Sequence, residues 1–250
     1  MYVVCIPSYK RATVCNQKTL NTLHTHHIGN IYVYVAKEDY ELYKTVLDPN
    51  LYTKLVIGKE GLVQQRQFIM EQWNEGEHIV FLDDDIDDID MSLSNHTLDT
   101  FIQHAFQECI THSSFIWGVY PVLNPFFRNT KREMTTDLKY IVGAFYGIKN
   151  RPLKELQLTL TESNGQKEDV ERTLRYYIQD GIVLRFNKIG FKTKYYGKVG
   201  GLGRFEERLK PMEEACLKLK EKYPEYGRIK IRKNGMHEFV LQPPKSPTQL

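Results

Sequence analysis

Short apolar runs alternate with amphipathic segments along the first third of the chain. The runs lie at residues 2–7, 31–36, 54–57 and 78–82. The segments between them, at 13–26, 38–47 and 61–73, place apolar side chains at helical spacing. The runs are continuous rather than alternating, which is typical of strands that helices cover on both faces. This order predicts an α/β fold with a Rossmann-like, doubly wound and mostly parallel sheet.

The rest of the chain is less regular. We expect helices at 97–112, 168–179 and 206–222, and strands at 113–122, 140–150, 182–190 and 192–196. The strand at 140–150 is suited to run antiparallel at the edge of the sheet. Loops are expected at 123–138 and 159–167, and a disordered tail at 243–250. A length of 250 residues suits one domain, which we place at 1–242.

Composition and charge narrow the protein class. Hydrophobic residues make up 41% and charged residues 26%, which is ordinary for a globular protein. The net charge of +3 does not by itself indicate a nucleic-acid binder. The four cysteines form no C-x-x-C pair, so we expect no zinc site and a reducing compartment, the cytoplasm. No apolar stretch is long enough for a membrane span, and we expect neither a signal peptide nor a membrane partner.

The segment HIVFLDDDIDDID, residues 78–90, places an acidic cluster directly after an apolar run. If the segment stays extended, Asp83 and Asp85 share one side of it, because side-chain direction has period two. Two such carboxylates can hold a hard divalent cation, Mg²⁺ or Mn²⁺. Asp87 forms a second, overlapping D-x-D with Asp85. The alternative is a solvated acidic turn.

Other polar residues follow the strands at the positions where doubly wound sheets bind ligands. The residues that could bind a nucleotide follow the first and second strands or lie in the first turns of the helix after the third strand. They are Pro7, Ser8, Arg11, Glu38, Gly61 and Arg66. The guanidinium of Arg66 has the fork geometry to bridge a diphosphate and the aspartates. Ordinary turns, a helix cap at Glu38 and a surface arginine are the alternatives.

Several motifs together resemble a known enzyme family. An apolar strand that ends in D-x-D resembles the signature of nucleotide-sugar glycosyltransferases with the GT-A fold. CIPSYKR, GLVQQRQFIM, GAFYGIKN and KEDVERTLR resemble, in the same order, further elements of that fold. The combination is most similar to the TET/JBP-associated glycosyltransferases, which are described as acting on hydroxymethyl-pyrimidines in DNA. The resemblance spans about residues 1–195.

The resemblance implies a GT-A sheet with a nucleotide-sugar-binding half, 1–95, and an antiparallel, acceptor-binding half, 96–242. It implies a UDP-sugar donor with Mn²⁺ or Mg²⁺ as cofactor. Asp83 would contact the ribose side and the metal, Asp85 would hold the metal, and Asp84 would support the site. His237 is a candidate third metal ligand, and Lys198 a candidate phosphate contact from a glycine-rich loop.

Glu168 and Asp169 open a predicted helix, and one of them is the candidate catalytic base of an inverting transfer, with Asp169 preferred. Capping of the helix by these carboxylates is the alternative.

The preferred acceptor is a 5-hydroxymethyl-pyrimidine in DNA. The basic segments 128–133 and 228–233 could contact phosphates, Phe126 or Phe127 could stack on bases, and Trp117 could form a wall for a sugar. The alternatives are a glycosyltransferase acting on a glycan or lipid hydroxyl, a nucleotidyltransferase, and a non-catalytic DNA-binding module of the same fold. A solvated basic edge is the alternative for the basic segments.

Overall fold

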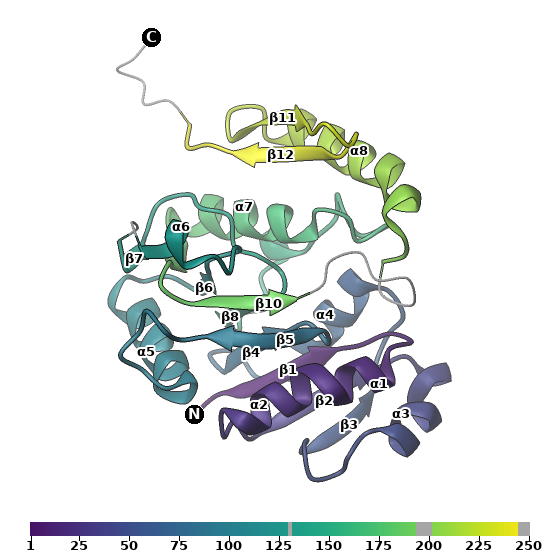
Figure 1. The fold of residues 1–250 in the computed structure, drawn as a ribbon. Helices are drawn as coiled ribbons and strands as arrows, with labels where there is room; N and C mark the ends of the chain where they lie inside the picture. Colours follow the sequence, from purple (N-terminus) through teal and green to yellow (C-terminus); the bar gives the residue numbers. More distant parts are fainter. Residues whose placement is uncertain (130–131, 194–201, 245–250) are drawn as a thin grey trace.

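A computed structural model describes residues 1–129, 132–193 and 202–244. Within these residues the main sheet has eight strands in the order β3-β2-β1-β4-β8-β6-β9-β7 (Figure 1). Its first half is parallel and consists of β1 (Val3–Pro7), β2 (Ile31–Val35), β3 (Lys54–Ile57) and β4 (His78–Leu82). The α/β fold with a mostly parallel, Rossmann-like sheet is therefore confirmed.

The second half of the sheet mixes directions. β8 (Phe145–Lys149) runs antiparallel between β4 and β6 (Ile116–Val119). β9 (Leu184–Phe186) is parallel to β6, and β7 (Met134–Thr135) closes the sheet antiparallel to β9. The predicted direction of β8 is confirmed, but its predicted place at the edge is wrong. Its first four residues are all buried, as suits a strand paired on both sides.

Helices cover both faces of the sheet, and alternate residues of each strand point into two separate cores. In β1, Val4 and Ile6 join the core beneath α1 (Ala12–Cys15), α2 (Asn21–Thr25), α3 (Tyr40–Val46) and α5 (Leu98–Thr111). One wider π-helical turn, Asn16–Leu20, joins α1 to α2. Val3 and Cys5 join the core beneath α4 (Leu62–Glu71) and α7 (Glu168–Asp180). This double burial explains the continuous apolar runs.

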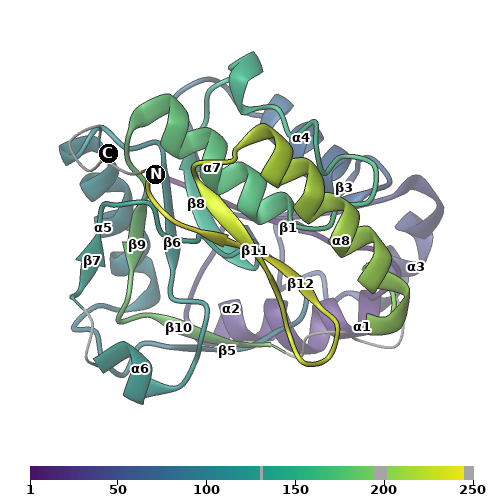
Figure 2. The ribbon, with the colours of Figure 1, turned by 90° about the horizontal axis from the view of Figure 1, so that it is seen from above.

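A further layer packs on α7. It consists of α8 (Phe205–Lys222) and the hairpin of β11 (Gly227–Ile231) and β12 (His237–Leu241), which lie above α7 in Figure 1 and in front of the main sheet in Figure 2. Leu174 of α7, Leu219 of α8 and Phe239 of β12 share the apolar core of this layer. The hairpin was not predicted. Its signal was present, because Ile229 and Ile231 alternate with charged residues as in a strand covered on one face.

Three further elements were not predicted. β5 (Ile86–Asp90) follows the acidic cluster and pairs with β10 (Gly190–Thr193) in a small antiparallel sheet. α6 (Pro125–Asn129) and β7 lie where a loop was expected. Arg128 of α6 is fully buried, pairs with Asp90 and donates 2.7 Å to the Lys188 carbonyl. The expectation that Arg128 contacts DNA phosphates is therefore wrong, since the side chain anchors α6.

Two other sequence interpretations can be placed in the structure. Trp117 is fully buried among aromatic rings of the core, so its predicted role as a wall for a sugar is wrong. All four cysteines are buried and free, as expected for small hydrophobic side chains at Cys5 and Cys109. In the part of the chain that the structure describes, no helix has the length and apolar character needed to cross a membrane.

The contact between β6 and β8 gives a test of the core. Gly147 lies opposite Trp117, and a Cβ atom on Gly147 would lie 2.4 Å from two atoms of the indole ring. Because neighbouring rings hold the indole, we expect Gly147→Ala to destabilise the protein by about 1–3 kcal/mol through overpacking. Denaturant unfolding measures this. Gly29→Ala is the control, since no atom lies within 4 Å of that added Cβ; equal losses would contradict the packing.

Candidate active site

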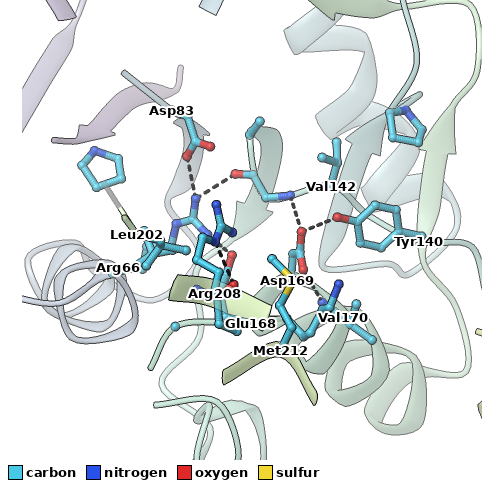
Figure 3. A pocket seen from close by; sticks show the side chains of 18 of the residues that line it. Arg66, Asp83, Tyr140, Val142, Glu168, Asp169, Val170, Leu202, Arg208 and Met212 are labelled. Carbon is cyan, nitrogen blue, oxygen red and sulfur yellow. Dashed lines mark hydrogen bonds and ion pairs between the residues drawn. The ribbon is translucent and has the colours of Figure 1, made fainter. Parts of the chain in front are cut away.

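A cavity of about 890 Å³ opens at the C-terminal ends of β1 and β4. One wall comes from the ends of these strands and the start of α4, and the opposite wall from the loop before β8 and the start of α7. α8 and β12 contribute Met212, Arg208 and Phe239 to the same cavity. Figure 3 shows the middle of this cavity, where charged side chains from the two walls meet. Its volume lies within the range of small-molecule sites.

The acidic cluster after β4 forms a turn rather than an extended segment, and Asp83, Asp84 and Asp85 all line the cavity. Arg11 Nη1 donates to both Asp84 Oδ1, at 3.0 Å, and Asp85 Oδ2, at 2.9 Å. The expectation that the chain stays extended through Asp83 and Asp85 is therefore wrong, because it turns at residues 84 and 85. Asp84 is 6% exposed and accepts a 2.5 Å hydrogen bond from Ser8, so it supports the turn.

Asp83 and Asp85 present the more accessible carboxylates. The side chain of Asp83 is 37% exposed and that of Asp85 17%. Asp83 Oδ1 accepts from Arg66 at 2.8 Å, and Asp85 Oδ1 accepts from Thr193 at 2.8 Å. Asp87 is exposed and pairs with Lys18 at 3.0 Å. The D-x-D that faces the cavity is thus Asp83–Asp85.

The turn carries an excess of negative charge. Three carboxylates face two guanidinium groups, those of Arg11 and Arg66, and Arg66 is shared with Glu168. Burial in the cavity wall raises the pKa of Asp83 to about 7 and that of Asp84 to about 6, and neighbouring carboxylates add to both rises. The arginines oppose these rises.

The donor chemistry of the turn fits a hard divalent cation, because carboxylate oxygens are the ligands that Mg²⁺ and Mn²⁺ prefer. Among the described residues, no three His, Cys, Asp or Glu side chains converge as ligands of one metal ion. Asp83 and Asp85 could hold such an ion together with water and phosphate oxygens, as Mg²⁺ sites in enzymes often do.

The other candidate residues divide into those that line the cavity and those that do not. Pro7, Ser8, Arg11, Gly61 and Arg66 line it. Glu38 is exposed on the short turn Lys37–Asp39 and is not part of the lining. His237 lies on β12, also outside the lining, with its Nε2 3.7 Å from Glu213 of α8. Lys198 lies outside the described residues.

A buried ion cluster joins the two walls of the cavity. Arg66 of α4 and Arg172 of α7 both bind Glu168, whose side chain is 5% exposed. Arg172 donates to Glu168 Oε2 at 2.5 Å, and its guanidinium lies 3.8 Å from the centre of the Tyr146 ring. Because both of its oxygens are engaged by arginines, Glu168 is poorly placed to act as a base, and Asp169 is the better candidate.

Arg66 is committed to protein groups. Its Nη1 binds Glu168, and its Nη2 donates 2.8 Å bonds to Asp83 and to the Gly143 carbonyl. The guanidinium is 5% exposed. The expectation that Arg66 itself bridges to a diphosphate is therefore not supported, since it holds Asp83 and Glu168 in place.

Gly143 is where the two walls approach most closely. A Cβ atom at this position would lie 2.8 Å from Glu168 Oε1, 3.1 Å from Arg66 Nη1 and 3.3 Å from the Asp169 Cβ. Only glycine allows this approach without displacing the ion cluster. Its carbonyl accepts from Arg66, and its N–H donates to Asp169 Oδ2 at 3.4 Å.

Asp169 is half-buried at the start of α7 and lines the cavity. Its Oδ2 accepts a hydrogen bond from the Tyr140 hydroxyl as well as from Gly143, and its Oδ1 accepts from the Val170 N–H at 2.9 Å. These donors hold the carboxylate in one orientation. An oriented carboxylate beside a cavity is suited to accept a proton.

Sequence analysis did not identify Tyr140, Gly143, Arg172 or Thr193. A local signal existed for Arg172 alone, because it follows Glu168 at the i, i+4 spacing of a helical ion pair. The other three reach the site through chain folding. Neither a protein-family model nor a curated protein matches the chain, so the functional interpretation rests on these residues and their geometry.

The buried cluster predicts a large effect of Glu168→Gln on stability. This change leaves Arg66 and Arg172 close together without their shared carboxylate, and we expect a loss of about 3–5 kcal/mol in the free energy of unfolding. Asp137→Asn is the control, because the side chains of its ion pair with Lys139 are 51% and 39% exposed and such pairs contribute at most about 1 kcal/mol. Denaturant titration measures the free energy of unfolding of both variants. Similar small losses in the two variants would mean that water screens the charges of the buried cluster.

Proposed function

We propose that the protein is a metal-dependent glycosyltransferase of the GT-A type that moves a sugar from a UDP-sugar to a hydroxyl acceptor. One observation carries this proposal. The cavity places the carboxylates Asp83 and Asp85 on one wall and the oriented carboxylate Asp169 on the other. Transfer of a sugar needs both functions, a cation site for the departing diphosphate and a base for the incoming hydroxyl.

The architecture is compatible with this assignment. The acidic turn follows β4, the last strand of the parallel set, and the antiparallel β8 comes next. In open α/β sheets ligands bind beyond the carboxyl ends of the strands, where this turn lies. The resemblance to GT-A enzymes and the cavity point to the same residues, which supports the GT-A assignment.

Each wall has a defined chemical task in the proposed reaction. Asp83 and Asp85 would hold Mn²⁺ or Mg²⁺, which neutralises charge that develops on the leaving diphosphate. The first turn of α4 begins at Gly61 without a side-chain cap, and its backbone N–H groups suit a phosphate. Asp169 would accept the proton of the acceptor hydroxyl as its oxygen attacks the anomeric carbon. Arg66, Glu168 and Gly143 would keep the two walls in register.

A 5-hydroxymethyl-pyrimidine in DNA is the preferred acceptor. Arg228 and Lys230 are exposed on β11, and the side chains of Phe126 and Phe127 are 72% and 49% exposed on α6. Exposed cations and aromatic rings suit phosphates and unstacked bases, respectively. A glycan or lipid hydroxyl is the second acceptor class, because the cavity is equally open to it. A nucleotidyltransferase would instead break an α–β phosphate bond.

The decisive assay incubates the protein with UDP-hexoses and Mn²⁺ on plain, 5-hydroxymethylcytosine and 5-hydroxymethyluracil DNA. We expect mass spectrometry of the nucleosides to show a hexose only on hydroxymethylated bases, and UDP as the second product. Transfer to a simple sugar but to no DNA would move the acceptor assignment to glycans. Release of pyrophosphate with nucleotide transfer would overturn the glycosyltransferase proposal.

Variants of the acidic turn test the cation site. We expect Asp83→Asn and Asp85→Asn each to lower kcat/KM at least about 100-fold, because each removes a negative ligand for the cation. Asp88→Asn is the matched control, since Asp88 belongs to the same acidic segment but is exposed and lies outside the cavity lining. Full activity of the Asp85 variant would exclude this role for the turn.

Asp169→Asn distinguishes a catalytic role of Asp169 from a role in stabilising the fold. The amide keeps the shape of the side chain but cannot take a proton and has one accepting oxygen fewer, so we expect kcat to fall about 100- to 10,000-fold and the free energy of unfolding to fall by only about 1 kcal/mol. Kinetics with saturating donor and a thermal melt give the two measurements. A normal rate would leave Asp169 as a helix cap only.

A further inference from the structure

Arg185 lies at the far end of the cavity from the acidic turn. It is the middle residue of β9, and its neighbours Leu184 and Phe186 point into the core beneath α5. Because side-chain direction alternates along a strand, Arg185 points to the opposite face, where it lines the cavity. β9 is three strands from β4 in the sheet, or roughly 14 Å at the usual strand spacing.

The guanidinium of Arg185 is held from two sides. Its Nε donates to Asn187 Oδ1 at 2.9 Å, and its plane lies 5.0 Å from the centre of the Tyr120 ring. These contacts fix the side chain but leave the two terminal nitrogens without a hydrogen-bond acceptor among the described residues. Two parallel N–H groups at the end of a fixed arginine are the geometry that binds an oxyanion bidentately.

Arg185 also differs from the buried arginines of the chain in its electrostatic partners. Every buried arginine forms an ion pair with at least one carboxylate. These arginines are Arg66, Arg128, Arg151 and Arg172. No described carboxylate forms an ion pair with Arg185, and its partial burial lowers its pKa below the usual range, an effect that Tyr120 and the more distant Asp137 oppose only in part. A desolvated cation without an anion is costly. Such a group gains stability when a ligand supplies the anion.

Two other cations that line the cavity are paired with carboxylates. Lys139 pairs with Asp137 at 2.7 Å, and Arg232 pairs with Glu238 at 2.6 Å. Arg185 has no ion-pair partner of this kind among the described residues. Its position three strands from the acidic turn favours an anion of the second substrate over the diphosphate that would bind at the turn.

We propose that Arg185 binds a phosphate group of the acceptor, and that the acceptor therefore carries a phosphate near the hydroxyl that receives the sugar. The inference rests on the proposed glycosyl transfer and specifies its acceptor side. The phosphate can be a terminal monoester or an internucleotide diester, since both present two oxygens to a guanidinium.

The test compares acceptors that differ only in phosphate. The acceptors are 5-hydroxymethyl-deoxycytidine, its 5′-monophosphate, and a dinucleotide that contains it. For Arg185→Gln we expect kcat/KM on the two phosphate-bearing acceptors to fall about 10- to 100-fold, mainly through the acceptor KM. The kcat/KM for the nucleoside and the KM for the donor should each change by less than about 2-fold, because neither the nucleoside nor the donor needs the guanidinium. A lower kcat/KM on the monophosphate would identify a site for a phosphate monoester. A lower kcat/KM on the dinucleotide alone would identify a site for a phosphate diester.

Two further variants sharpen the comparison. Arg185→Lys keeps the charge but loses the fork and the fixed plane, so we expect an intermediate loss. Lys54→Gln makes the same change in net charge on the exposed start of β3, at the opposite edge of the sheet, and should behave as the wild type. An equal loss on nucleoside and nucleotides, or no loss on either, would overturn the proposal.

A binding measurement separates this inference from the proposed function. Fluorescence anisotropy with a labelled single-stranded oligonucleotide should show about 10-fold weaker binding and a shallower salt dependence for Arg185→Gln than for Lys54→Gln. If Arg185→Gln weakens oligonucleotide binding as expected but the wild type transfers no sugar, the proposed reaction is wrong and the phosphate site is supported. Equal binding by the two variants would remove the phosphate site even in an active enzyme.

Discussion

Two arginines that share one buried carboxylate set the geometry of this protein's cavity. Arg66 and Arg172 reach Glu168 from different helices, in a space where all three side chains are at most 6% exposed. Charges that leave water must be paired closely, so the two helices cannot shift independently. The same guanidinium of Arg66 holds Asp83 at the end of β4 and the carbonyl of Gly143 before β8. The central strands and both covering helices of this face thus meet at one point.

This arrangement gives the charged residues of the cavity separate duties. Arg66, Glu168 and Arg172 neutralise one another and hold the walls together. Asp83 keeps part of its carboxylate open to the cavity, and Asp169 is oriented by Tyr140 and by backbone N–H groups. A site that must stabilise charge on one wall and accept a proton on the other requires both carboxylates to stay fixed. The buried cluster supplies that rigidity without occupying the cavity itself.

The layer of α8 and the β11–β12 hairpin adds side chains to the wall of the cavity. It rests on α7 through apolar contacts that include Leu174, Leu219 and Phe239. Because α7 also carries Glu168 and Asp169, the layer is tied to the same helix as the candidate base. β9 contributes Arg185 to the lining of the same cavity, without an ion-pair partner among the described residues.

The order of amino acids was sufficient to predict the parallel half of the sheet, the helices that flank it and the position of Asp83 to Asp85 at a strand end. These features follow from apolar periodicity and from the rule that ligands meet strand ends, and both act over a few neighbouring residues. It also identified Arg66 and Asp169 as candidates, but not their partners. The folded chain was needed to show that Arg66 binds Glu168, 102 residues away, that Arg128 anchors α6 and that β8 lies inside the sheet. Side-chain pairs and strand order over such separations are set by how the layers pack, and no local spacing in the chain encodes them.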